Sequence, residues 1–154
     1  MTSRNIPQEM NHDQVKSLLR FIDDTQDEAV KEELFGRLGR DCFYSRRLDS
    51  WIAGYRGDLE AFLDWVNVKK GSRYWERLEP AADGRTLVLT GKEVDGCACA
   101  FADCGDPPTS LCRHCCRRMQ EELFGLLLGR KVEVRVTEAF LLGDKRCSTE
   151  IVLA

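Results

Sequence analysis

SLCRHCCRRMQEELFGLLLGRKVEVRVTEAFLLGDKRCSTEIVLA, residues 110–154, decides the predicted fold, because its hydrophobic pattern changes from a helical to an alternating period. The first part predicts one amphipathic helix, which begins after an N-cap at Thr109 or Ser110 and ends at Gly129. On a helical wheel, one face carries the three cysteines of this helix with its apolar residues, whereas its arginines and His114 lie on the other face. We therefore expect the cysteine-bearing face to pack into the core.

The segments on both sides of this helix predict strands. Residues 131–142 and 146–154 alternate in hydrophobicity, and Gly143-Asp144 between them is a strong turn signal. Upstream, residues 85–101 are interpreted as two strands about a turn at Gly91. The order is β-β-α-β-β, which predicts an α+β fold with an antiparallel sheet.

The N-terminal half of the chain has a helical period instead. It predicts four helices, in residues 12–23, 27–42, 49–55 and 57–70. Residues 72–84 are ambiguous, and we interpret them as a short helix that ends at Pro80, followed by a polar turn. The chain is thus predicted to be a single domain, residues 1–154, with a helical half, 1–80, and a cysteine-rich half, 81–154.

The predicted helices carry large aromatic side chains. Together these side chains have more apolar surface than isolated helices would leave exposed to water. We therefore expect the helices to cover the sheet and either to enclose a pocket or to form a homodimer interface. The residues on which this expectation depends are Phe35, Trp51, Phe62 and Trp65.

Charge and hydropathy exclude several classes of protein. The formal net charge of −3 is not that of a general nucleic-acid binder. The polar residues 1–20 contain no signal-peptide core, and no later run reaches membrane-spanning length. We expect a cytoplasmic protein with neither nucleic acid nor membrane as partner, whose thiols stay reduced, so a disulfide framework is disfavoured.

Six of the eight cysteines lie between residues 97 and 116, which is more crowding than packing alone explains. On the predicted strand, Cys97 and Cys99 share one face with Phe101, because the side-chain period of a strand is two. Cys147 is predicted to lie on the inward face of the last strand. Cys42 continues the apolar stripe of an earlier helix and is interpreted as a small core residue.

Crowded thiols favour a metal site. Soft thiolates select zinc, iron–sulfur clusters or copper(I), and a structural zinc site needs four ligands. Because the spacing does not match ferredoxin patterns, zinc is preferred and an iron–sulfur cluster is the alternative. The predicted ligands come from Cys97, Cys99, Cys104, Cys112, Cys115, Cys116 and Cys147.

A thiol redox role is a further alternative. Cys112 and Cys115 form a Cys-x-x-Cys pair in the first turn of a helix, where the helix dipole stabilises a thiolate. However, a thioredoxin-like motif follows a strand in a βαβ unit, which is not the pattern here. His114 is not expected to be a ligand, because it points away from the cysteines. Glu138 lies where the strand alternation slips, as at a β-bulge, and we place it at the surface.

Three features of the C-terminal half carry a resemblance to known proteins. They are a cysteine at the helix start, Leu-Gly-Arg at the helix end, and Gly143-Asp-x-x-Cys147 before the terminal strand. With these features, residues 85–154 resemble the four-vinyl-reductase-type domain, a small-molecule-binding module of bacterial and archaeal regulators and chlorophyll-pathway proteins. The segment is also similar to cysteine-rich bacterial proteins called aminothiazoline-carboxylate-hydrolase-like.

The resemblance implies a ligand set. In aromatic-sensing members of that family, zinc is held by a cysteine at the helix start, a Glu-x-x-Cys on the next strand and a cysteine after the turn. This implies one ligand at Cys112, to within one sequence position, and another at Cys147. The middle pair falls on Val136 and Ala139, which cannot bind a metal, so the other ligands must come from the remaining cysteines or the site has shifted.

Two functional classes stay open. The first is a small-molecule-binding or sensory module, in which a cysteine-bound metal joins the helix to the sheet beside a pocket. The second is a metal-dependent hydrolase of a small molecule, in which a metal with an open position activates water. A closed four-thiolate site favours the first, and so does the lack of a general base near the cysteines. The sequence does not identify the small molecule.

Overall fold

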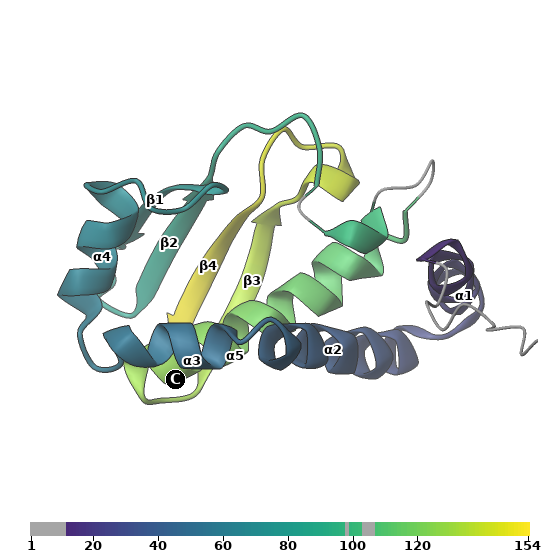
Figure 1. Ribbon diagram of the computed structural model, residues 1–154, viewed down its shortest axis with the longest axis horizontal. Coiled ribbons are helices and arrows are strands. Elements are labelled where there is room, and N and C mark those ends of the chain that lie inside the picture. The colour runs from purple at the N-terminus through teal and green to yellow at the C-terminus, as the bar shows by residue number, and fades with distance from the viewer. Residues whose placement is uncertain (1–11, 98, 103–106) are drawn as a thin grey trace, which may run out of the picture.

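The centre of the protein is an antiparallel sheet of four strands in the order β1-β2-β4-β3 (Figure 1). The computed structural model describes residues 12–97, 99–102 and 107–154. The strands are β1 (Trp75–Pro80), β2 (Thr86–Gly91), β3 (Val132–Glu138) and β4 (Ser148–Leu153). The α-helices are α1 (His12–Thr25), α2 (Glu28–Ser45), α3 (Leu48–Ile52), α4 (Leu59–Asn67) and α5 (Arg117–Leu128). Short helical segments of the described chain are η1 (Ala53–Tyr55), η2 (Ala100–Ala102), the π-helix η3 (Leu111–Cys116) and η4 (Phe140–Leu142).

The α+β class and the helices of the N-terminal half are confirmed. Two of these helices begin at aspartates whose side chains accept a hydrogen bond from the first turn: Asp27 from the N–H of Val30, and Asp58 from the N–H of Ala61, both at 2.9 Å. At the other end of the chain, α5 stops at Gly129, whose φ of 65° is left-handed, as predicted for a glycine C-cap.

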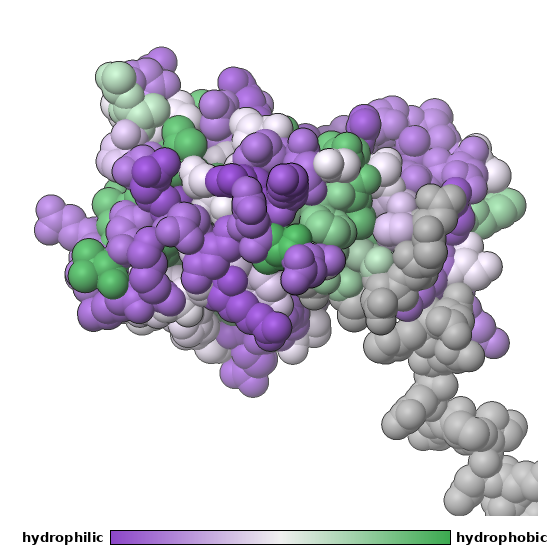
Figure 2. Space-filling model, turned by 90° about the horizontal axis from the view of Figure 1, so that it is seen from above, coloured by the Kyte–Doolittle hydropathy of each residue, from purple (hydrophilic) through white to green (hydrophobic). Residues whose placement is uncertain are grey.

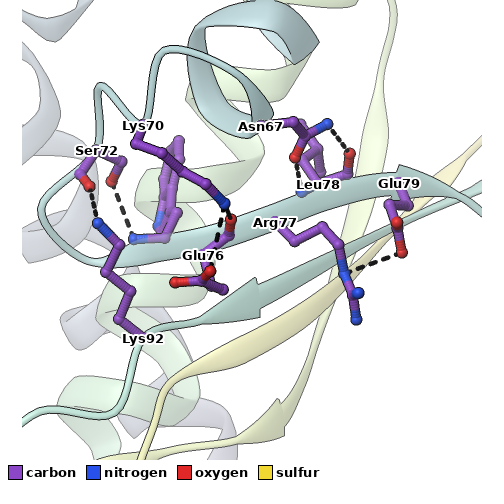
Figure 3. A network of polar contacts seen from close by, with 9 residues as sticks. Asn67, Lys70, Ser72, Glu76, Arg77, Leu78, Glu79 and Lys92 are labelled. Carbon is purple, nitrogen blue, oxygen red and sulfur yellow. Dashed lines mark hydrogen bonds and ion pairs between the residues drawn. The ribbon is translucent and has the colours of Figure 1, made fainter.

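The helix predicted in residues 72–84 is wrong. Residues 75–80 form β1, an edge strand that pairs with β2 across a turn closed by the Asp83 carboxylate, which accepts the N–H groups of Arg85 and Thr86. The edge position explains why the sequence of β1 was misread. Only Leu78 of this strand is buried, so its hydrophobic and polar residues hardly alternate. Figure 3 shows how the side chain of Asn67, at the end of α4, bonds both backbone groups of Leu78.

The second strand predicted in residues 85–101 is also wrong. After β2 the chain leaves the sheet at Gly91, and no strand occurs in the described residues between there and η3. The place beside β2 is taken by β4, so this segment has no neighbour with which to pair. Cys97 and Cys99 therefore lie in a connection rather than on one face of a strand, and Phe101 lies in η2.

The strand predicted in residues 131–142 ends earlier than expected. The β3–β4 register shifts between Val136 and Glu138, so the bulge predicted at Glu138 is confirmed. Beyond Glu138 the chain forms η4 and turns at Gly143, where φ is 98°. Cys147 precedes β4 and is exposed, so its predicted place on the inward face is wrong.

Two apolar clusters hold the fold together. The larger one joins the sheet to α2, α3, α4 and α5, and includes Phe43, Ile52, Phe62, Leu89, Phe124 and Ile151. Trp51 and Trp65 pack against it, so α3 and α4 cover the sheet as expected, whereas Phe35 lies in the smaller cluster. The smaller cluster lies at the other end of α2 and contains Phe35, Leu111 and Cys115.

The π-helix η3 changes which side chains the start of the long helix buries. In an α-helix His114 would face solvent, but it is buried, with 7% of its surface exposed. Two causes combine. The wider turn of a π-helix shifts the phase of the residues, and α2 covers the side that the helical wheel assigned to water. The close approach depends on Gly39 of α2, where a Cβ atom would lie 2.1 Å from the carbonyl oxygen of Cys115.

Candidate thiol and metal site

Three segments of the chain meet at one end of the sheet. They are the segment that follows β2, the connection between β3 and β4, and the first residues of η3 (Figure 1). The N–H of Val94 donates to the carbonyl of Lys145 at 3.1 Å, and Arg146 pairs with Glu93 at 3.1 Å. Gly91 allows the closest approach, because a Cβ atom there would lie 2.1 Å from the carbonyl oxygen of Cys147. These contacts bring cysteines that are far apart in the sequence to one region.

In the first group of thiols, Cys97 is the neighbour that the other three share. Its side chain forms a hydrogen bond with the thiol of Cys112, and it is close enough to raise the pKa values of Cys116 and Cys147 electrostatically. The Cys147 sulfur also accepts the N–H of Phe140 at 3.4 Å. These four cysteines, Cys97, Cys112, Cys116 and Cys147, are called the outer thiol group below.

A second group of thiols lies between α2 and η3. Cys115 belongs to the smaller apolar cluster, and Cys99 packs against that cluster. Cys42 of α2 lies three residues beyond Gly39 and, like Cys97 of the outer thiol group, acts electrostatically on both Cys99 and Cys115, so the two groups adjoin each other. These three cysteines, Cys42, Cys99 and Cys115, are called the inner thiol group below.

Burial favours the protonated form of the Cys99, Cys115, Cys116 and Cys147 thiols by raising their pKa values. It raises the pKa of Cys115 to about 12 and the pKa of Cys116 well above its usual range. The pKa of Cys112 is also raised, first by its hydrogen bond with Cys97 and then by burial. A nucleophilic cysteine needs a lowered pKa, so this environment does not favour redox chemistry at Cys112 and Cys115.

The predicted ligands are distributed unevenly. Six of the seven fall into the two groups, and Cys104 lies outside the described residues. Among the residues that the structure describes, no three His, Cys, Asp or Glu side chains are placed to hold a metal ion together. Val136 and Ala139, the positions of the family's middle pair, lie at the bulged end of β3 and directly after it. Glu138 between them accepts a hydrogen bond from the Ser148 hydroxyl at 2.7 Å.

A layer of polar contacts between α1, α2 and the start of the long helix was not predicted. His114 Nε2 lies 2.7 Å from a Glu28 carboxylate oxygen, and Arg117 donates to Glu32 at 2.6 Å. The Ser110 hydroxyl donates to Asp23. His114, which was expected to face water, is buried and contacts Glu28 of α2. No short motif could reveal this layer, because its partners are more than 80 positions apart.

One hollow in the described surface is polar, and no cysteine lines it. It has a volume of about 840 Å³, lies between α2, α5 and the start of β3, and is lined by charged side chains such as Arg40, Arg118 and Glu122. Figure 2 shows hydrophilic side chains over much of one face, with a hydrophobic area towards the side that carries α1 in Figure 1. On α1 itself, Leu18 and Phe21 are exposed by 58% and 61%. The homodimer and the small-molecule pocket stay predictions.

Comparison with known proteins assigns no family. No model of a protein family matches the chain, and no curated protein does. Among solved structures, it is similar to a trafficking protein particle complex subunit 3 from Naegleria fowleri, crystallised covalently bound to palmitic acid. The identity is 14%, the TM-score is 0.42, and the match covers 95% of this chain and 84% of that one. A likeness at this level carries no conclusion about function. None of the described helices is long and apolar enough to cross a membrane.

Proposed function

We propose that the protein is a cytoplasmic small-molecule-binding or sensory module in which the outer thiol group binds one zinc ion. The observation that carries the proposal is the position of Cys97, in contact with Cys112 and close to Cys116 and Cys147. Four thiols supply the tetrahedral set of a structural zinc site. The resemblance to four-vinyl-reductase-type domains, which implies ligands at Cys112 and Cys147, supports the same choice.

Zinc binding would require local rearrangement and loss of thiol protons. The described cysteines are not arranged around one point, so the ion must draw the sulfurs together. Cys97 lies in the connection after β2, and Cys147 lies at the end of the connection between β3 and β4. Because neither residue belongs to a helix or strand, their side chains can move towards the ion at low cost. A bound divalent cation lowers the pKa values of its thiol ligands and thereby offsets the effect of burial.

A closed site supports binding rather than catalysis. With four thiolates, zinc has no open position at which to activate water, and the metal joins η3 to the two connections at the end of the sheet. Its role is then to fix the geometry of this end of the fold. A hydrolase would instead need a site with three protein ligands and water.

The experiment is elemental analysis of protein purified without added metal, compared with two ligand variants. Cys112→Ser and Cys147→Ser are expected to lower zinc content and the free energy of unfolding together, because metal-binding free energy is folding free energy in such sites. Full zinc retention in both variants would show that the site lies elsewhere. A wild-type chain without metal, with freely titratable thiols, would refute zinc binding, and a visible absorbance band would indicate an iron–sulfur cluster.

The matched control is Cys42→Ser, which changes a thiol outside the outer group. It is expected to keep the wild-type zinc content and to lower the free energy of unfolding by about 1–3 kcal/mol, the cost of burying an unpaired hydroxyl. Loss of zinc in this variant would mean that the two thiol groups form one site.

A further inference from the structure

We infer that a second hollow, between the start of the long helix and the edge strand β3, binds a small organic anion: a carboxylate carried by an apolar body. The hollow has a volume of about 310 Å³. It combines a few charged groups with an apolar wall, which is the usual character of a small-molecule site. The inference rests on the proposed small-molecule-binding role and names the class of ligand, but it makes no use of the zinc site.

The hollow wraps around the outer edge of β3. Successive side chains of a strand point to opposite faces, so Val134 and Val136 lie on the covered face of the sheet and Arg135 on the exposed one. Residues of both faces line the hollow, and Arg113 of η3 and Arg117 of α5 line its other side. These two arginines are four positions apart, close to one helical turn, so both reach the same hollow.

Positive charge is in excess in this hollow. Glu133 is the one carboxylate among the described residues that line it, and it pairs with Arg135 at 3.0 Å. Arg113 forms no ion pair with any residue that the structure describes. Arg117 donates to Glu32 through a terminal nitrogen, but its Nε is buried and has no hydrogen-bond partner in the described part of the chain. Because a buried donor without a partner is costly, an anion that accepts from this group would be stabilised.

The hollow of about 840 Å³ between α2 and α5 differs in this respect. Its arginines meet carboxylates that line the same hollow: Arg37 pairs with Glu33 at 2.7 Å, and Arg118 pairs with Glu122 at 3.1 Å. These charges neutralise one another, so an added anion would gain little there. The arginines at β3 are available instead, and a guanidinium group binds a carboxylate through two parallel hydrogen bonds.

Apolar side chains decide what the anion must carry. Leu142 of η4 lines the hollow with 42% of its surface exposed, and Val136 beside it is partly exposed. Covering these surfaces with hydrocarbon is favourable, whereas an inorganic anion would leave them in water. The carboxylate is therefore assigned to the arginines, and the hydrocarbon part to Leu142 and Val136.

The test is titration of the full chain, as purified, with hexanoate, butanoate and inorganic phosphate at neutral pH, followed by the amide chemical shifts of the protein. Hexanoate should shift the amides of Val136 and Leu142. It should bind more tightly than butanoate, by up to about fourfold for each methylene group that the hollow buries, and more tightly than phosphate. Arg113→Gln should weaken hexanoate binding by about tenfold or more, because a charge-assisted hydrogen bond is lost.

Two further variants serve as controls. Arg37→Gln removes the same charge from the larger hollow and should bind hexanoate like the wild type. Leu142→Ser should reduce the difference between hexanoate and butanoate, whereas Arg113→Gln weakens the binding of both. All three positions are partly or fully exposed, so these variants are expected to fold, which circular dichroism would verify.

A wild-type chain that does not bind hexanoate would overturn the inference, and so would equal effects of Arg113→Gln and Arg37→Gln. Phosphate that binds as tightly as hexanoate would refute the assignment of an apolar ligand. Elemental analysis of the same samples keeps the two proposals apart. A chain that contains zinc but does not bind hexanoate refutes this inference alone. A zinc-free chain whose hexanoate binding depends on Arg113 refutes the zinc site alone.

Discussion

At the scale of single residues, two glycines determine how closely the cysteine-bearing segments approach their neighbours. Gly39 brings α2 against η3, and Gly91 brings the end of β2 against the backbone of Cys147. We predict that Gly39→Ala lowers the free energy of unfolding by about 1–3 kcal/mol, because its Cβ would meet the Cys115 carbonyl at 2.1 Å. Urea unfolding followed by circular dichroism measures this change.

Gly36→Ala is the matched control in the same helix. Nothing lies within 4 Å of a Cβ atom at that position, so the substitution should raise the free energy of unfolding by about 0.5–1 kcal/mol, through helix propensity alone. If both variants were equally stable, the close contact between α2 and η3 would not limit packing.

The sequence predicted the residue types of the candidate site better than their positions. The crowding of thiols was visible, but Cys97 and Cys99 were placed on a strand that does not form. His114 was placed in water because the wheel used the 3.6-residue period, which a π-helix does not follow. The pairing of Cys97 with Cys112 depends on how the segment after β2 approaches η3 in space, which local patterns do not encode.

At the scale of elements, the side chain of Asn67 connects α4 to β1 by hydrogen bonds. Asn67 accepts the N–H of Leu78 at 2.9 Å and donates to its carbonyl at 2.8 Å (Figure 3). We predict that Asn67→Ala lowers the free energy of unfolding by about 2–4 kcal/mol, because two backbone groups of a buried residue lose their partners. Asn67→Asp should cost less, since its carboxylate still accepts the N–H.

The exposed ion pair between Arg77 and Glu79 of β1, at 3.1 Å, provides the contrast. Arg77→Gln is expected to change the free energy of unfolding by less than about 1 kcal/mol, as is usual for a solvent-exposed pair. Hydrogen exchange of the β1 amides would show the difference directly. Protection of β1 equal to wild type in Asn67→Ala would contradict the role assigned to this side chain.

The elements that the sequence predicted correctly are those with strong local signals. Helices with an aspartate cap and a clear apolar stripe, such as α2 and α4, were located well. The edge strand β1 was missed because it buries a single residue, and the order of strands follows from pairing that no local pattern shows. The α+β class was predictable because it depends only on the presence of both the helical and the alternating hydrophobic period in the sequence.

At the scale of the whole molecule, the buried thiols make stability depend on pH. Burial raises the pKa of Cys115 from 9.0 to about 12, so the folded chain keeps a proton that the unfolded chain loses. The resulting contribution of Cys115 to the free energy of unfolding is fully present below pH 9.0 and is lost as the pH rises towards 12. We predict that the free energy of unfolding of metal-free protein falls in this range, by about 1.4 kcal/mol per pH unit for Cys115 alone.

Urea titrations at a series of pH values measure the slope, and Cys115→Ala isolates the thiol from lysine and tyrosine side chains that ionise in the same range. The variant should show a shallower slope than the wild type. Zinc should also reduce the slope, because ligands such as Cys112 and Cys116 are then already thiolates. An equal slope in the wild type and Cys115→Ala would show that this thiol does not retain its proton.

The two edges of the sheet have a consequence for how the protein associates. Along β1, the side chain of Asn67 already bonds the N–H and the carbonyl of Leu78, and Pro80 lacks an N–H group. Along β3, a β-bulge in the pairing with β4 lies before Glu138, and a bulge bends the strand that carries it. Bulges, prolines and charged side chains at sheet edges prevent other strands from adding to them. The folded chain is therefore protected against fibril growth, and any protein that binds it must dock on its side-chain surface rather than extend the sheet.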